Sequence, residues 1–350
     1  MVDFSNYDPD NLGNPNNNIF GLPTTEDGAN LIIFPVPWEV TVSYGAGTAR
    51  SAESIFKASL QVELYDADFP ESWKQGYYMR HTDKKMLMKS DYLRKEAELY
   101  LDYISKGEDV NANQFIKKTL REVNEGSDLM NTWVYEQTKA LLAKDKMVGL
   151  LGGDHSTPLG FYKSIGEKFG SFGILQVDAH CDLRIAYEDF KYSHASIMYN
   201  ALKEVPQIER IVQIGVRDYS EGEWNYIQES NFRVIPYFEK EIRTRLYEGQ
   251  TWKLIADEII RKLPDKVHIS FDIDGLDPKL CPNTGTPVHG GFETEQLFYL
   301  FNSILKSGRK IIGFDLVEIG VGESDWDANV GARVLFKLCN LLVASNEAAS

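Results

Sequence analysis

Cysteine is scarce in this chain. Only three cysteines occur among 350 residues, Cys181, Cys281 and Cys339, and their spacings follow no pattern. Both a disulfide framework and a zinc knuckle need paired or regularly spaced cysteines, so the sequence excludes both. A low, odd number of cysteines is typical of a reducing compartment, and we expect a cytoplasmic protein without disulfides.

Positive charge is also in short supply, with 37 Lys and Arg against 52 Asp and Glu and a formal net charge of −15. A protein that binds nucleic acid must neutralise phosphates, so nucleic acid is not an expected partner. The surplus of carboxylates fits a cationic substrate, a metal site or simple solubility. Composition alone leaves these three explanations open.

Long apolar runs are missing as well. No run approaches the roughly 20 residues that a membrane span needs. Residues 1–18 are acidic and Asn-rich, unlike the basic and apolar start of a signal peptide. We therefore expect neither a membrane anchor nor a membrane partner.

The sequence does contain a series of short, almost wholly apolar segments separated by amphipathic helical patterns. These segments are 31–37, 147–152, 172–178, 210–216, 232–237, 267–274 and 310–318. Strands that are apolar on both sides are typical of a parallel sheet whose two faces are covered by helices. The pattern predicts an α/β fold with three layers, αβα, around a central and mostly parallel sheet.

The remaining segments predict how the chain is divided. Residues 1–28 are polar and turn-forming, and indicate an N-terminal arm lying over the domain or over a partner subunit. Residues 29–350 are expected to form a single domain. Within it, residues from about 66 to 126 show helical patterns but no convincing strand, and predict a helical insertion. Ser51 is expected to cap a helix that begins there.

Two polar clusters follow apolar strands. Gly152 and Gly153 allow a sharp turn that presents His155, and Asp178, His180 and Asp182 follow the next strand at alternate positions. Side chains alternate along an extended segment, so these three should point the same way. Buried carboxylates and an imidazole at one place repel or stay desolvated unless a cation joins them.

A third cluster repeats this arrangement. Asp272 and Asp274 lie on one face of the strand 267–274, while the odd-numbered residues face the core. His268 lies on the aspartate side but roughly 13 Å upstream of the tip, at the rise of an extended strand. We therefore expect His268 to be structural, and the aspartates to join the other clusters at the carboxyl edge of the sheet.

Two histidines and four aspartates exceed the ligands that one ion needs. This oxygen-rich set with a few imidazoles suits a pair of divalent cations such as Mn²⁺, with Ni²⁺, Co²⁺ or Fe²⁺ as alternatives. A structural calcium or magnesium site is disfavoured by the histidines, because hard cations prefer oxygen ligands. The expected ligands are His155, Asp178, His180, Asp182, Asp272 and Asp274.

Three motifs together resemble the signatures of the ureohydrolases, the family of arginase and agmatinase. They are Gly-Gly-Asp-His-Ser at 152–156, Asp-Ala-His-Cys-Asp at 178–182 and Ser-Phe-Asp-Ile-Asp-Gly-Leu-Asp-Pro at 270–278. The resemblance implies an arginase-like fold, two metal ions and cleavage of a guanidinium C–N bond with release of urea. It also implies assembly into homotrimers or homohexamers.

The resemblance further implies roles for single residues. His194, in Ser-His-Ala-Ser, matches the proton-shuttling histidine of the family, and Glu318 matches the glutamate that pairs with the guanidinium. Asp182 is expected to orient the nucleophile and accept its proton. Substrate contacts are also expected from three other residues: Arg184, Thr286 and His289.

The expected substrate is a small cationic guanidino compound. Segments 36–45 and 191–199 resemble the agmatinase branch, and within it the enzymes that hydrolyse free guanidine, so guanidine is favoured and agmatine follows closely. Aromatic side chains are expected either to close the pocket or to belong to the core or subunit contacts: Trp38, Tyr44, Tyr187, Tyr192 and Trp326. Two alternatives remain, a formimidoylglutamase-type enzyme and a non-catalytic interaction protein with the same fold.

Overall fold

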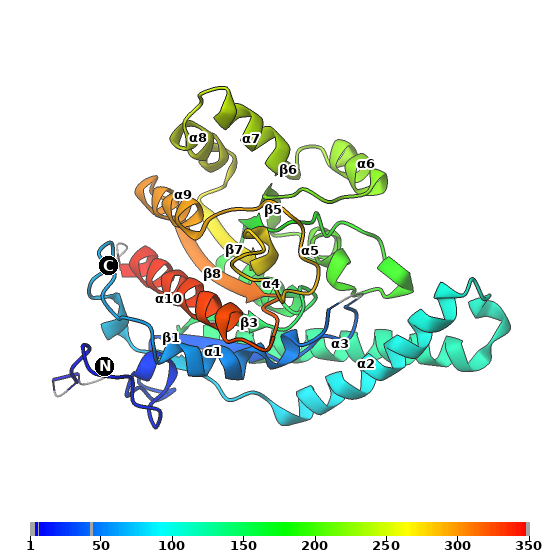
Figure 1. Cartoon of the computed structure of the whole chain (residues 1–350), viewed down its shortest axis with the longest axis horizontal. Helices are drawn as coiled ribbons and strands as arrows, with labels where there is room; N and C mark the ends of the chain where they lie inside the picture. Colours follow the sequence, from blue (N-terminus) through cyan, green and yellow to red (C-terminus); the bar gives the residue numbers. More distant parts are fainter. Residues whose placement is uncertain (1–3, 6, 43–44, 348–350) are drawn as a thin grey trace.

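A single eight-stranded sheet forms the centre of the molecule (Figure 1). The computed structural model describes residues 4–5, 7–42 and 45–347. The strands are β1 (Leu31–Val36), β2 (Tyr77–Met79), β3 (Met147–Gly152), β4 (Phe172–Val177), β5 (Ile208–Ile214), β6 (Val234–Tyr237), β7 (Lys266–Asp272) and β8 (Lys310–Val317). Their order is β2-β1-β3-β8-β7-β4-β5-β6, and every described pair is parallel.

Helices cover both faces of the sheet, which confirms the predicted three-layer αβα fold. They are α1 (Ser51–Ser59), α2 (Lys84–Ser105), α3 (Gln114–Leu142), α4 (Leu159–Phe169), α5 (Ile197–Glu204), α6 (Glu221–Glu229), α7 (Glu239–Tyr247), α8 (Trp252–Lys262), α9 (Thr294–Lys306) and α10 (Trp326–Glu347). Neighbouring residues of one strand enter opposite cores: Ile33 packs with α1 and α10, and Ile32 packs with α3 and α4. This two-sided burial is the reason why the strands are apolar throughout.

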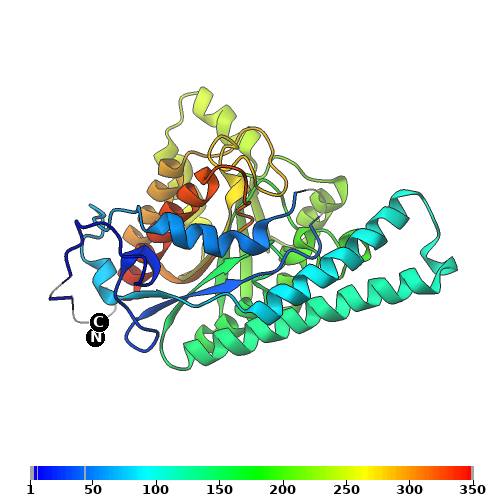
Figure 2. The ribbon, with the colours of Figure 1, turned by 60° about the horizontal axis from the view of Figure 1, so that its bottom comes forward.

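Helices α2 and α3 form a long hairpin along one side of the molecule (Figure 2). The expectation that residues 66–126 contain no strand is wrong, because β2 lies there and pairs with the edge strand β1. Three residues at a sheet edge leave too short a pattern to be read from sequence. Helix α3 also runs beyond the expected end of the insertion, to Leu142.

The described part of residues 1–28 packs on the domain itself. Phe4 and Tyr7 contact the ring of Trp73, and the buried Phe20 packs edge-on against Phe336 of α10. Ser51 does not cap α1 as predicted: it is the first helical residue, and its hydroxyl donates to the carbonyl of Gly152. That bond ties α1 to the tip of β3.

Cys181, Cys281 and Cys339 are free and buried, as expected from their spacing.

Helix α10 is long and apolar enough to cross a membrane, but 83% of its apolar window is buried within the molecule. Burial of this kind is typical of a helix that packs in the core of a layered domain.

Gly153 is the point where three strand tips meet. Its N–H donates to Val36 of β1, its carbonyl accepts from the N–H of Glu318 after β8, and a Cβ at Gly153 would overlap the carbonyl oxygen of Trp38. Glycine is therefore required here because the backbones approach so closely.

Replacing Gly153 with Ala should lower the free energy of unfolding by about 1–3 kcal/mol, because the added methyl must push two backbone segments apart. Urea denaturation monitored by circular dichroism measures the change. Gly222→Ala is the matched control, since its nearest non-neighbouring atom would be 3.9 Å away. Equal stability of the wild type and Gly153→Ala would contradict this account.

Candidate metal centre

The carboxyl ends of β3, β4 and β7 meet at one edge of the sheet. The strands lie in the order β3-β8-β7-β4, so their tips stand side by side with only β8 between them. The six side chains predicted as ligands come together there: His155, Asp178, His180, Asp182, Asp272 and Asp274. Asp272 is the last residue of β7, Asp274 lies in the short 3-10 helix Ile273–Gly275 that follows it, and the other four lie on the loops after β3 and β4.

Within this cluster the side chains form two groups that share one carboxylate. His155, Asp178 and Asp182 offer atoms that lie within 4.8 Å of one another, and so do Asp178, His180 and Asp274. Asp272 joins the first group, because its Oδ2 lies 3.2 Å from His155 Nδ1. Asp178 therefore belongs to both candidate metal sites. The sequence alone did not show how the six ligands are divided between two ions.

The side chains converge for a different reason than simple alternation along a strand. β4 ends at Val177, and Asp182 adopts a left-handed backbone conformation with φ of 55°. The Asp178 carboxylate accepts the N–H of His180 at 2.6 Å, and Asp272 accepts the N–H of Asp274 at 2.9 Å. Aspartates that bond to the backbone two residues on create tight turns, and these turns bring the groups together.

The hydrogen bonds around His155 determine which of its nitrogens faces the cluster. Ser270 donates its hydroxyl proton to Asp315 at 2.8 Å, so it accepts from His155 Nε2 at 2.9 Å. Tyr162 also donates to Ser270 at 3.0 Å. Nε2 therefore carries a proton, and Nδ1 is the nitrogen that faces the cluster, with the ring held in place by a second layer of buried polar groups.

This nitrogen faces three carboxylates. His155 Nδ1 lies 3.0 Å from Asp178, 3.0 Å from Asp182 and 3.2 Å from Asp272, and it has no hydrogen-bond partner among the described residues. A single N–H could satisfy only one of these oxygens, and a lone pair would repel all three. A cation bound between the four groups fits this geometry, because it attracts every atom that points at it.

The pKa shifts of the clustered side chains also favour bound positive charge. Burial and the neighbouring Asp178 raise the pKa of Asp182 to about 7, and burial together with Asp274 raises the pKa of Asp272 well above its usual value. Burial acts to lower the pKa of His180, yet Asp274 and Asp178 raise it to about 12. Asp178 makes ionisation of Asp182 more costly and Asp274 that of Asp272, whereas His155 and His180 lower the pKa of Asp178 against the effect of burial, so positive charge shared among these groups stabilises the cluster.

His268 is structural, as expected. It is fully buried, its Nε2 lies 2.6 Å from Asp315 Oδ2, and it belongs to neither candidate group among the described residues. Asp315 thus holds both His268 and the Ser270 that orients His155. The sequence contained a signal for Asp315, since it is a lone carboxylate in an otherwise apolar strand.

Glu318 follows β8 in a left-handed conformation with φ of 62°. Its Oε1 accepts the N–H of His155 at 2.8 Å, and Thr284 donates to its backbone carbonyl at 2.8 Å. Its Oε2 is buried and has no partner among the described residues. Burial and the nearby Asp154 raise the pKa of Glu318 well above its usual value, so a cation beside it would be strongly favoured.

A pocket of about 480 Å³ opens above the cluster, within the size range of small-molecule sites. Five predicted residues line it: His180, Asp182, Arg184, His194 and Thr286. His194 lines the pocket at the start of a short helical turn. Its backbone N–H donates to the hydroxyl of Thr41 at 3.1 Å. Burial and His180 lower the pKa of His194 to about 4, so its imidazole is uncharged at neutral pH.

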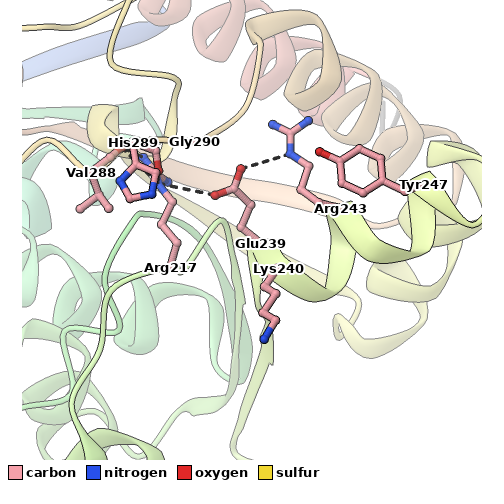
Figure 3. A pocket seen from close by; sticks show the side chains of 8 residues that line it. All are labelled: Arg217, Glu239, Lys240, Arg243, Tyr247, Val288, His289 and Gly290. Carbon is pink, nitrogen blue, oxygen red and sulfur yellow. Dashed lines mark hydrogen bonds and ion pairs between the residues drawn. The ribbon is translucent and has the colours of Figure 1, made fainter.

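His289 lies elsewhere. In the described chain it lines a separate pocket with Arg217, Glu239 and Arg243, and does not line the pocket above the cluster (Figure 3). Arg217 holds this region by donating to the carbonyls of Asp274 and Val288. Val288, the neighbour of His289, lines both pockets, so the substrate contact expected of His289 stays a prediction.

Of the aromatic residues expected near the pocket, one lines it and the other described ones do not. Tyr187 lines it, whereas Trp38 and Tyr192 are buried and belong to the core. Trp326 donates to the carbonyl of Lys279 and is not among the described lining residues. Tyr44 lies outside the described residues.

Some residues of the site carry no signal in the sequence. Asp218 and Tyr219 line the pocket from the loop after β5, because the N–H of Asp218 donates to Ala179 at 3.1 Å and brings that loop beside His180. No motif surrounds them. Only the neighbouring positions of β4 and β5 in the sheet reveal the contact.

Comparison with known proteins places the chain in a family. A model of the Arginase family matches residues 29–339. The N(1)-aminopropylagmatine ureohydrolase of Thermus thermophilus is 28% identical over 304 residues, which cover 86% of each chain. The agmatinase of Halalkalibacterium halodurans is 26% identical over 292 residues, covering 83% of this chain and 84% of that protein.

A solved structure shows the same fold. The agmatine ureohydrolase of Thermoplasma volcanium superposes with a TM-score of 0.66 at 21% identity, and the match covers 93% of this chain and 92% of that one. The family model spans most of the chain, including every strand tip of the cluster. The chain is therefore a hydrolase that belongs to the arginase family, the ureohydrolases, and its relatives are of the agmatinase type.

Proposed function

We propose that the chain hydrolyses the guanidinium C–N bond of a small guanidino compound and releases urea. The observation that carries this proposal is the pair of side-chain groups that share Asp178 on the floor of a pocket. Two cations at these positions need not be structural, because His180 and Asp182 belong to the cluster and also line the pocket. A substrate in the pocket would therefore lie directly against them.

The donor set fits a pair of divalent metal ions. One ion would be held by His155, Asp178, Asp182 and Asp272, and the other by Asp178, His180 and Asp274. Carboxylate oxygens with one imidazole for each ion suit Mn²⁺ or Ni²⁺. Bound together, such ions supply a nucleophilic water at neutral pH.

The protein's own residues would bind the substrate and move protons. Glu318 has one buried oxygen without a partner among the described residues, and a guanidinium N–H is the kind of donor that satisfies it. Asp182 would orient the attacking water and accept its proton. His194 is uncharged at neutral pH, so it would take up the proton that Asp182 received from the water and then pass it to the departing nitrogen.

The pocket favours a substrate with a distal positive charge. Asp218 is exposed at its wall and forms no ion pair within the described chain. Arg184, by contrast, lies 3.8 Å from Glu223 and over the ring of Tyr187. A free carboxylate beside an arginine that already has partners suits an alkylguanidine with a terminal ammonium, such as agmatine, better than an anionic formimidoyl substrate.

Free guanidine is the second candidate. It is supported by the likeness of segments 36–45 and 191–199 to guanidine hydrolases, whereas the free carboxylate of Asp218 gives it no further support. We also propose a cytoplasmic location and assembly into homotrimers or homohexamers. These two proposals rest on the cysteine content and on the family resemblance.

Urea release tests the proposed activity directly. The purified chain is loaded separately with Mn²⁺ or Ni²⁺ and supplied with agmatine, guanidine, guanidinobutyrate, arginine or formimidoylglutamate. We expect urea from agmatine or guanidine with at least one of the metals. Release of formamide from formimidoylglutamate alone, or no product from any compound, would reject the proposal.

Replacing His194 with Asn should lower kcat by about 100-fold, because general acid–base catalysis by one side chain contributes at least that much. The metal content should not change, since His194 belongs to neither candidate group. His81→Asn is the control, because His81 lines a different pocket. An unaffected kcat in His194→Asn would remove this residue from the mechanism.

Replacing Asp218 with Asn should raise KM for agmatine about tenfold and leave KM for free guanidine unchanged. A hydrogen bond to a charged group contributes about 1.5–3 kcal/mol, and a tenfold change corresponds to about 1.4 kcal/mol. Asp265→Asn, before β7 and at the opposite edge of the sheet, serves as the control. An equal effect on both substrates would exclude a contact between Asp218 and the substrate's tail.

A further inference from the structure

The loop that carries Arg184, Tyr187 and His194 to the pocket is strained. Four of its non-glycine residues have left-handed backbone conformations: Asp182 (φ 55°), Ala186 (φ 46°), Glu188 (φ 56°) and Asp189 (φ 61°). Each such residue costs on the order of 1 kcal/mol or more, and persists only where the surrounding structure holds it. Contacts from outside the loop must therefore maintain this conformation.

The hairpin of α2 and α3 supplies these contacts. The hydroxyl of Tyr100, in α2, donates to Asp189 Oδ2 at 2.5 Å, and the Tyr100 ring lies 5.3 Å from the ring of Phe190. Both rings are fully buried. Burial and the Asp189 carboxylate raise the pKa of Tyr100, so its hydroxyl remains a donor at any physiological pH.

Asn124, in α3, binds the backbone of the same loop twice. Its amide nitrogen donates to the carbonyl of Asp189 at 3.2 Å, and its amide oxygen accepts the N–H of Lys191 at 2.7 Å. Together with Tyr100, it holds both the side chain and the backbone of Asp189, the last left-handed residue of the loop. A side chain that bonds to the backbone on both sides of one residue restricts the torsions between them.

The segment that Tyr100 and Asn124 contact, around Asp189, is continuous with residues that line the pocket. Asp189 closes the short helical turn that begins at Tyr187, and the Tyr187 ring lies 6.4 Å from the ring of His194. Arg184 also lines the pocket, and its guanidinium lies over the Tyr187 ring, 4.7 Å from the ring centre. A shift of Asp189 would therefore move Tyr187, and with it the packing of His194 and Arg184.

The hairpin also holds a second segment that contacts His194, residues 39–42. Ser90 of α2 accepts the N–H of Glu39 at 3.1 Å, and Arg94 donates to the carbonyls of Val40 and Val42. Thr41, within that segment, accepts the N–H of His194. One pair of helices thus contacts both chain segments that place His194.

We propose that Tyr100 and Asn124 are positioning residues for catalysis: they hold the strained loop 182–193 in the conformation that places Tyr187 and His194 at the pocket. The hairpin is then part of the catalytic apparatus, although none of its described residues lines the pocket above the cluster. This inference rests on the proposed function for its effect on turnover, whereas its effect on the loop stands independently.

The test combines kinetics with hydrogen exchange on the full chain loaded with metal. In Tyr100→Phe and in Asn124→Ala we expect kcat/KM for the guanidino substrate to fall about tenfold, with unchanged metal content. Amide exchange within 183–193 should become faster in both variants. Tyr103→Phe is the matched control, because its hydroxyl donates to Asp109 inside the hairpin at 3.2 Å and does not contact the loop.

Relief of the strain provides a second readout. Glycine adopts a left-handed conformation without cost, so Ala186→Gly (φ 46° at Ala186) should make Tyr100 and Asn124 partly dispensable, while the Asp189 carboxylate that Tyr100 contacts is kept. In that background, Tyr100→Phe should change kcat/KM by less than about twofold, because residues that act through one another are not additive. A merely destabilising substitution would instead have the same effect in both backgrounds.

The outcomes separate the two proposals. Unchanged exchange in 183–193, or a tenfold loss that persists in Ala186→Gly, would overturn the role of the hairpin. Absence of urea release by the wild type would overturn the proposed function instead. The exchange measurement would still decide whether Tyr100 and Asn124 hold the loop.

Discussion

The site depends on one constraint: four buried aspartates and two histidines meet at the end of a parallel sheet, where they cannot coexist without shared positive charge. His155 makes this clear, since its Nδ1 faces three carboxylate oxygens while its Nε2 is held by Ser270. Asp178 lies between the two groups and belongs to both. A pair of cations resolves the repulsion, and the pocket above then gives a substrate access to them.

The sheet creates this meeting point, and the loops complete it under strain. Parallel strands place all their carboxyl ends at one edge, so residues far apart in sequence converge without a dedicated binding domain. Asp182 and Glu318 both adopt left-handed conformations at that edge. Strained residues of this kind persist only where neighbouring structure holds them: the N–H of Glu318 donates to Gly153 at the tip of β3, and the carbonyl of Asp182 accepts the N–H of Met198 in α5.

Much of this architecture could be predicted from sequence because it follows from burial. The apolar strands identified the sheet, and polar residues at their ends identified the six side chains of the cluster. What could not be predicted depends on contacts between distant segments. β2 is too short to leave a pattern, the turns at Asp178 and Asp272 replace strand alternation, and Asp218 reaches the pocket only because β5 lies beside β4. The substrate contact expected of His289 stays a prediction, since His289 lines a neighbouring pocket with Arg217.

Anomalous diffraction from crystals grown with Mn²⁺ would locate metal ions bound at the cluster. We expect two peaks about 3.5–4 Å apart, the spacing of catalytic metal pairs, with the carboxylate of Asp178 in contact with both. A single peak, or peaks that do not touch Asp178, would contradict this expectation.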